Sequence, residues 1–370
     1  MSFLALPNEI ILQICGQLEK PLPALNSLLR TNIRLANLII PTLLDTLFQL
    51  RSRKFGRRAL CYSAERADAS MLLTLLARGV EEFIGDKFIH DKMQVLSPPA
   101  LRLLLECGVN AERSDKQGRR PLHAAALRGD ECTIWALLQF GRVELNSLDK
   151  MRDTPLSLAA SVGHFSTVEY LLSLPGIRIN PTEPGRVSPL WQAISGGHEE
   201  VVRLLLAQPS LQTNRWCFFQ AQPQSPVCMA AFSGHTGIVG LLLDDERVEY
   251  VSSHARWAEW ECASPLHAAA GAGHVETVKV ILARKNIDVN LCPQNPRCDT
   301  ALHLAIAMGH EEVVRLLLED GRAYVHQKNS LGMSAFAIAA AAGHTSIMKM
   351  LVSENYQRAL DIDGLGNREY

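Results

Sequence analysis

The chain has 370 residues, 47% of them hydrophobic, and its 37 lysines and arginines nearly balance its 38 aspartates and glutamates. This length exceeds the size at which one hydrophobic core usually stops growing, so we expect either several folding units or one elongated array. The balanced charge gives no overall field for nucleic acid or an anionic membrane surface, and no uncharged run is long enough to cross a bilayer.

The first fifty residues contain three leucine-rich stretches separated by prolines and by a polar step. In the first stretch, apolar residues recur at four-residue spacing at Leu6, Ile10, Ile14 and Leu18, which predicts a helix with one apolar face. Three short helices of this length would share a marginal core. Residues 1–50 are therefore predicted to form a small helical domain that is stabilised by packing against the neighbouring repeat or against another protein.

The segment that opens Leu6-Pro7-Asn8-Glu9 and continues as an apolar helix resembles the F-box. A later segment, Arg30 to Leu38, is similar to the third helix of that family, although Leu35 stands where many members carry an aromatic residue. The resemblance implies docking on the Skp-type adaptor of a cullin-RING ubiquitin ligase. The matching apolar contacts would be Leu6, Pro7, Ile10, Ile14 and Leu18. The alternative is that these helices only cover the apolar end of the array that follows.

From about residue 51 onward the sequence repeats with a period near 34 residues, which is typical of stacked helix-turn-helix units. Each unit has an anchor residue, and two apolar residues stand 16 and 17 positions after it. The anchors are Ala59, Pro121, Pro155, Pro189, Pro226, Pro265, Ala301 and Ala335. The apolar pairs are Leu75 and Leu76, Leu137 and Leu138, Leu171 and Leu172, Leu205 and Leu206, Leu242 and Leu243, Ile281 and Leu282, Leu317 and Leu318, and Leu351 and Val352. We expect these pairs to fill the space between consecutive units.

The residues around each anchor predict where the helices begin and end. Thr or Ser precedes most anchors, so its side chain can accept a hydrogen bond at a helix start, and proline fits the first helical position. Glycine stands eight positions after most anchors, for example at Gly163 and Gly273, and is expected to close the first helix in the left-handed conformation. Histidine, or Asp130 in one unit, follows that glycine and is predicted to cap the second helix.

The segment from Ser264 to Glu276, with its Ser-Pro-Leu-His-Ala-Ala and Gly-His elements, resembles the ankyrin repeat. The resemblance implies an all-α ankyrin solenoid of helix-turn-helix units with hairpin loops over residues 51–367, with about nine repeats. The second repeat is degenerate: Leu103 to Leu105 supply its second helix, and residues 83–99 lack a recognisable first helix. The family implies protein partners rather than small-molecule substrates.

Aromatic residues gather where the distance between anchors is longest. Trp216, Phe218 and Phe219 lie in the connection before Pro226, and Trp257 and Trp260 in the connection before Pro265. Exposed aromatics there would be binding hot spots, and Trp191 on a first helix could join them. The alternative is that the rings fold under their own loops and stabilise them.

The remaining motifs do not indicate catalysis, a metal or a cofactor. The histidines recur in repeat register, and the His-Glu-Glu sequences at His198 and His310 lack the second histidine of a zinc-protease helix. Cys292 and Cys298 have no second cysteine pair to complete a zinc site. Nine cysteines without framework spacing are typical of reduced thiols, so we expect a cytoplasmic or nuclear protein.

The sequence leaves two functions open, neither of them enzymatic. The first is a substrate receptor of a Skp-cullin-F-box ubiquitin ligase, which recruits an unidentified substrate protein through its repeats. The second is an ankyrin scaffold or regulatory inhibitor whose N-terminal helices only cap the stack.

Overall fold

The computed structural model describes residues 48, 51, 53–85, 87–93, 95–181, 187–215, 217–219, 222–249, 264–292 and 297–353. The F-box-like segment with Leu6, Pro7, Ile10, Ile14 and Leu18 lies outside the described residues.

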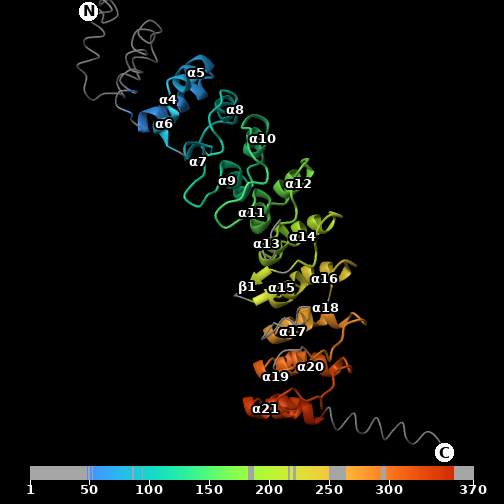
Figure 1. The fold of residues 1–370 in the computed structure, drawn as a ribbon. Helices are drawn as coiled ribbons and strands as arrows, with labels where there is room; N and C mark the ends of the chain where they lie inside the picture. Colours follow the sequence, from blue (N-terminus) through green and yellow to red (C-terminus); the bar gives the residue numbers. More distant parts are fainter. Residues whose placement is uncertain are drawn as a thin grey trace, which may run out of the picture. The chain divides into compact units, whose positions relative to one another are not determined.

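The described chain is built almost wholly of short helices, which follow one another in pairs (Figure 1). They are α4 (Arg53–Glu65), α5 (Ala69–Ala77), α6 (Glu81–Ile84), α7 (Phe88–Lys92), α8 (Pro98–Glu106), α9 (Pro121–Arg128), α10 (Glu131–Phe140), α11 (Pro155–Val162), α12 (Phe165–Ser173), α13 (Pro189–Ser195), α14 (Glu199–Leu206), α15 (Pro226–Phe232), α16 (Thr236–Asp244), α17 (Pro265–Ala272), α18 (Val275–Leu282), α19 (Ala301–Met308), α20 (Glu311–Glu319) and α21 (Ala335–Ala342). Residues 345–353 are also helical. Two short strands, β1 (Cys217–Phe219) and β2 (Gln222–Gln224), pair antiparallel before α15.

The contacts divide the chain into two compact units. The first comprises Met1–Ala125 with Asp130–Leu145, and the second comprises Ala126–Gly129 with Asn146–Tyr370. None of the described helices combines the length and apolar character needed to span a lipid bilayer.

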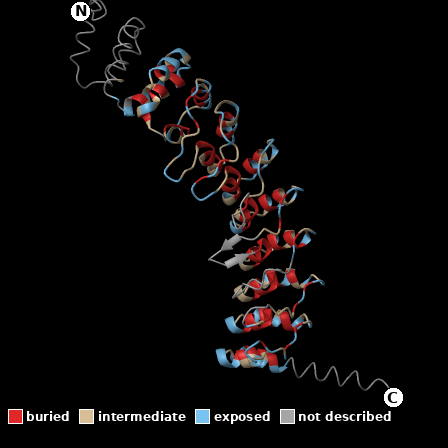
Figure 2. Cartoon of the chain, in the orientation of Figure 1, coloured by how far each residue is buried: buried red, intermediate tan, exposed pale blue. Residues whose placement is uncertain are grey.

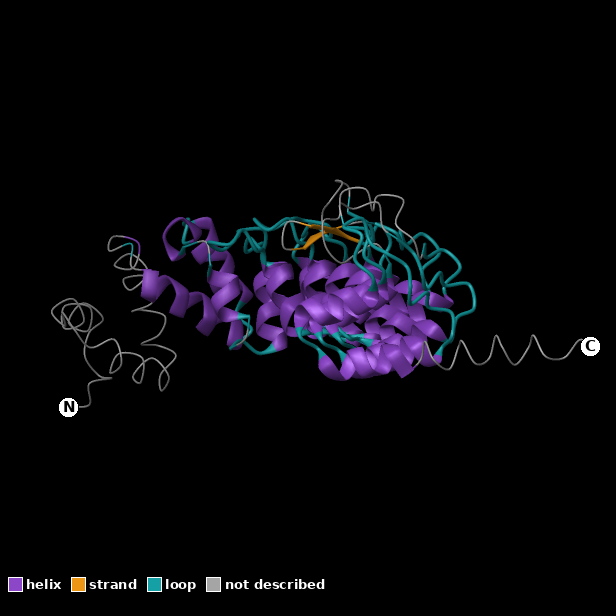
Figure 3. Ribbon diagram, turned by 90° about the horizontal axis from the view of Figure 1, so that it is seen from below, coloured by secondary structure: helices purple, strands orange, loops and turns teal. Residues whose placement is uncertain are grey.

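In the second unit, equivalent helices stack on one another in chain order. The first helices α11, α13, α15, α17, α19 and α21 pack consecutively, and the second helices α12, α14, α16, α18 and α20 form a parallel row (Figure 1). Buried residues occur in every helix pair of this unit (Figure 2). The long connections of this unit run along one side of the helices (Figure 3). This arrangement confirms the expected helical ankyrin fold.

The anchor positions confirm the predicted helix starts. Each helix from α9 to α21 that contains an anchor begins on that anchor residue, with proline or alanine at the first position. The preceding hydroxyl accepts the backbone N–H three residues later in all six predicted cases, at Thr154, Ser188, Ser225, Ser264, Thr300 and Ser334. Gly163 and Gly273 close their helices at φ of 82° and 78°, as predicted.

The two residues of each apolar pair in the second helices differ in how deeply they are buried. The first residue of every pair is 0% exposed: Leu75, Leu137, Leu171, Leu205, Leu242, Ile281, Leu317 and Leu351. The second residue is half-buried in most units, buried at Leu243 and Leu318, and exposed at Val352 in the last described helix. The pairs were expected to fill the space between consecutive repeats. The first residue of each pair is buried throughout, as expected, whereas the second is fully buried in only two repeats.

The first unit departs from the regular pattern in two places. Helix α4 begins at Arg53, six positions before Ala59, where no Thr-Pro or Ser-Pro element fixes the start. The degenerate repeat, for which no first helix was recognised, contains the five-residue helix α7 ahead of α8. Its buried residues Phe88 and Ile89 replace the small apolar residues of the other first helices.

Candidate functional site

Of the predicted partner-binding aromatics, three lie outside the described residues and two lie in a short strand before α15. Trp216, Trp257 and Trp260 are outside the described part of the chain, and the backbone of Phe218 and Phe219 forms part of strand β1. The register of the hairpin pairs Phe218 with Pro223 and Phe219 with Gln222. The extra length before α15 is thus used for a small antiparallel hairpin.

Trp191, the sixth predicted contact, is part of the packing of α13. Its side chain is 4% exposed, and its backbone N–H donates to Oγ of Ser188 at 3.1 Å. A ring covered to this extent contributes to the core. Its participation in partner binding stays a prediction that would require the ring to move.

The histidines that follow the helix-closing glycines bind backwards to the preceding repeat. Nε2 of His164 donates to the carbonyl of Leu127 at 3.1 Å, His198 to Ser161 at 3.0 Å, His274 to Phe232 at 2.8 Å and His310 to Gly271 at 3.0 Å. None of these histidine side chains caps its own helix. The prediction that this position provides cap chemistry is therefore wrong for histidine.

Asp130 behaves as the prediction required. Its carboxylate accepts the backbone N–H of Thr133 at 3.0 Å and the hydroxyl of the same residue at 2.6 Å. A carboxylate is short enough to fold onto its own helix start and is favoured there by the helix dipole. The imidazole ring reaches further and finds a carbonyl in the neighbouring repeat.

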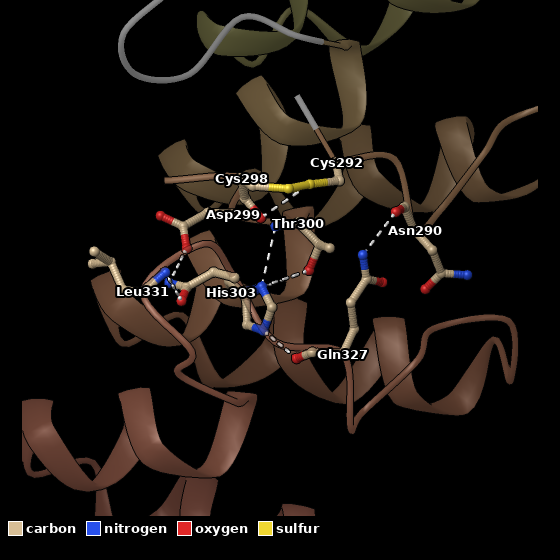
Figure 4. The surroundings of a disulfide bond; sticks show 9 residues. Asn290, Cys292, Cys298, Asp299, Thr300, His303, Gln327 and Leu331 are labelled. Carbon is tan, nitrogen blue, oxygen red and sulfur yellow. Dashed lines mark hydrogen bonds between the residues drawn. A yellow bond between two sulfur atoms is a disulfide. The ribbon is translucent and has the colours of Figure 1, made fainter. Parts of the chain in front are cut away.

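A second set of histidines braces the first helices. His123, His267 and His303 are at most 1% exposed. Nδ1 of His267 lies 2.8 Å from Oγ of Ser264, and Nε2 of His303 lies 3.0 Å from the carbonyl of Gln327 in the next connection (Figure 4). Burial lowers the pKa of His303 and lowers that of His267 to about 4. The three rings brace the first helices, as their periodic placement indicated, and the lowered pKa keeps His267 and His303 neutral near pH 7.

Asparagines 25 positions after four of the anchors tie each connection to the next. Nδ2 of Asn146 donates to the carbonyl of Gly176 at 2.8 Å, while Oδ1 accepts the N–H of Arg178 at 2.8 Å. Asn180, Asn214 and Asn290 each make the equivalent pair of bonds. Sequence reasoning missed this asparagine ladder, although its repeat spacing was a usable signal. The ladder holds neighbouring connections at a fixed distance.

Cys292 and Cys298 are joined by a disulfide, with Cα atoms 5.0 Å apart, at the base of the connection between α18 and α19 (Figure 4). This pairing departs from the expectation of reduced thiols throughout the chain. Cys61, Cys107 and Cys132 carry free thiols, and Cys228 carries a buried thiol. Burial raises the pKa of Cys228 to about 11. Among the described residues, no group of three or more His, Cys, Asp or Glu side chains could hold a metal ion.

Comparison with known proteins agrees with this repeat geometry. A family model of ankyrin repeats matches residues 93–183 and 227–329, which together are more than half of the chain. No curated protein sequence matches. The chain is similar to the crystal structure of the human ASB11 ankyrin repeat domain, with 26% identity and a TM-score of 0.52, covering 64% of this chain and 98% of that one. The stacked helix pairs, their caps and the family match together show that this chain belongs to the ankyrin repeat family.

Proposed function

We propose that the chain is a substrate receptor of a cullin-RING ubiquitin ligase. Residues 1–50 dock on the Skp-type adaptor, and the ankyrin stack binds the protein to be modified. The Leu6-Pro7-x-Glu9 opening, followed by apolar residues at helical spacing, is the observation that carries the ligase part of this proposal. The chain itself performs no chemistry in this role: it holds two binding surfaces at a set separation.

The stack supplies what a receptor needs on its substrate side. Ankyrin repeats are protein-interaction modules. In this chain consecutive repeats are joined by buried leucines, by hydrogen bonds from histidines and by the asparagine ladder. A surface tied in this way loses little conformational entropy when a partner binds. We place the receptor in the cytoplasm or nucleus, where its ligase partners would meet it.

The adaptor interaction is tested by retention of the full-length chain on an immobilised purified Skp-type adaptor. The wild-type chain is expected to bind, and Leu6→Asp to lose binding because a carboxylate would be buried against an apolar surface. Leu331→Asp is the matched control, because Leu331 is 64% exposed in a distant repeat. If the wild-type chain is not retained, the ligase role fails and the ankyrin scaffold with capping helices takes its place.

The aromatic residues Trp216, Trp257 and Trp260 are proposed to contact the substrate. Their combined replacement by alanine should abolish proximity labelling of substrate proteins in cells while leaving the melting temperature nearly unchanged. A lowered melting temperature would instead assign the rings to support of their own loops.

A further inference from the structure

The last described helix pair, α21 with the helix of residues 345–353, differs in its surface from the pairs before it. Phe336, the residue after the anchor in α21, is 40% exposed. Its equivalents in five other first helices of the second unit are at most 3% exposed: Leu156, Leu190, Val227, Leu266 and Leu302. Ala340, one turn further along α21, is exposed as well. Its equivalents are 0% exposed: Ala160, Ile194, Ala231, Ala270 and Ile306. At both positions α21 lacks the cover that its predecessors have.

The second helix of this pair shows the same change. Valine recurs at one position of five second helices and is 0% exposed in each: Val168, Val202, Val239, Val278 and Val314. Met348 stands at that position in the last described helix and is half-buried. Val352, the second residue of the last apolar pair, is 56% exposed. We call Phe336, Ala340, Met348 and Val352 the end face.

In the other repeats, the residues that come next in the chain cover the equivalent face. Helix α21 packs on α19, and α20 packs on α18. The connection that follows a helix pair also returns to that pair, because Nε2 of His303 in α19 lies 3.0 Å from the carbonyl oxygen of Gln327. In a stack whose units contact only their neighbours, the cover of each face comes from the adjoining segment. The segment that adjoins the end face is residues 354–370, outside the described part of the chain.

The sequence of residues 354–370 contains the apolar spacing of a covering connection. Two apolar residues separated by one other residue are buried in the connections after α18 and α20, where they are at most 7% exposed: Ile287 with Val289, and Ala323 with Val325. Leu360 and Ile362 have the same spacing. Contact between these side chains and the end face would remove apolar surface of both from water.

We propose that residues 354–370 fold back over the end face, with Leu360 and Ile362 against Phe336 and Val352. The contact lies within one chain and takes the place of the contact between repeats elsewhere in the stack. It withdraws an apolar surface that would otherwise be open to a second copy of the chain or to another protein. The proposal goes beyond the proposed function and depends on neither adaptor docking nor substrate binding.

The first test replaces Phe336 of the full-length chain by the photo-reactive analogue benzoylphenylalanine, which keeps an aromatic ring at that position. Irradiation should give a product of monomer mass in which position 336 is linked to residues 354–370, as identified by mass spectrometry after proteolysis. Phe165 in α12 is the matched control position, because it is also 40% exposed, and the analogue there should give no link to this segment. Links from position 336 only to a second copy, or to none of residues 354–370, overturn the proposal.

The second test uses natural side chains throughout. Leu360→Ser/Ile362→Ser should speed hydrogen exchange at the amide of Ile338 in α21 about tenfold, because loss of the cover raises the population of the locally opened helix. The amide of Val168 in the distant helix α12 should exchange at an unchanged rate.

The matched control for this test is Gln357→Ser/Asn367→Ser, which changes two polar residues of the same segment and should leave the exchange at Ile338 as in the wild type. Exchange in the wild-type chain should also be independent of protein concentration, as expected of a contact within one chain. Protection of Ile338 that rises with concentration would assign the cover to a second copy and overturn the proposal. Equal exchange at Ile338 in the two variants would overturn it as well.

Discussion

The ring of His198 occupies the space in which a side chain on Gly163 would stand, since a Cβ atom at Gly163 would lie 2.4 Å from Nδ1 of that ring. The bond from Nε2 of His198 to the carbonyl of Ser161 holds the ring there at 3.0 Å. The glycine therefore serves two purposes: it permits a φ of 82° that ends α11, and it leaves room for the neighbouring repeat.

We expect Gly163→Ala to lower the free energy of unfolding by more than the usual cost of placing a side chain at a positive φ. The matched control is Gly321→Ala, because Gly321 has a φ of 76° but nothing within 4 Å of the added Cβ. The control should cost about 1 to 2 kcal/mol, the usual penalty for a side chain in this conformation. Gly163→Ala should cost visibly more in urea unfolding followed by circular dichroism. Equal losses of unfolding free energy in the two variants would show that the ring of His198 can move aside without destabilising the chain.

Acid should destabilise the stack through His267. The folded pKa is about 4, against 6.5 for the ordinary side chain, so the unfolded chain binds a proton that the folded chain does not. The stability contributed by the neutral ring is therefore complete above pH 6.5 and is lost as the pH falls from 6.5 towards 4. Between pH 7.5 and 5 the loss should be about 2 kcal/mol.

The measurement compares urea unfolding at those two pH values for wild type and His267→Asn, whose amide can still face Ser264. The variant should show a smaller difference between the two pH values. The control is His326→Asn at an exposed position, which should retain the full difference. If His267→Asn also retains it, the acid sensitivity belongs to other groups.

Loss of one asparagine of the ladder should weaken only the connection to which that asparagine bonds. Asn214→Ala removes the bonds to the carbonyl of Arg247 at 2.6 Å and from the N–H of Glu249 at 2.8 Å, and should cost about 1 to 3 kcal/mol. Hydrogen exchange at the amide of Glu249 should accelerate, whereas exchange at Arg178 should not. Asn146→Ala should reverse this pattern, because its partner is Arg178. General acceleration in both variants would contradict a local role.

Cysteine reactivity distinguishes the three kinds of thiol environment. In the folded chain Cys132, which is exposed, should react with iodoacetamide, whereas Cys228 should not, because it is buried and its pKa is raised to about 11. Mass spectrometry without reductant should find Cys292 linked to Cys298. Reduction of that link should cost roughly 2 kcal/mol by the chain-entropy estimate for so short a loop. Alkylation of both residues in the untreated chain would show that the link is absent.

The sequence predicted the helix starts well because their signals are local. A hydroxyl, a proline and a short apolar run act within one turn, so Thr154 and Pro155 define α11 without reference to distant residues. The start of α4 was missed because no such element stands at Ala59. Local chemistry thus decides which residues of a repeat can be assigned in advance.

The bonds between repeats were harder to predict because their partners are distant in sequence. The carbonyl bound by His198 belongs to a residue 37 positions earlier, and no local rule separates this bond from a helix cap. The candidate site was anticipated only in part for the same reason. Trp191 is of a residue type that is common at binding sites but is covered by packing, which depends on the neighbouring helices that the stack brings against it.

Asp130 marks a joint with different mechanics. Where other repeats reach back to their predecessor with an imidazole, this side chain closes on its own helix, so α8 and α10 pack together without that link. That packing is close, and the backbone N–H of Glu144 donates to the carboxylate of Glu112 at 2.7 Å across the same junction. In a linear array whose modules contact only their neighbours, each junction can thus be held by its own set of contacts, so that a change at one need not weaken the next.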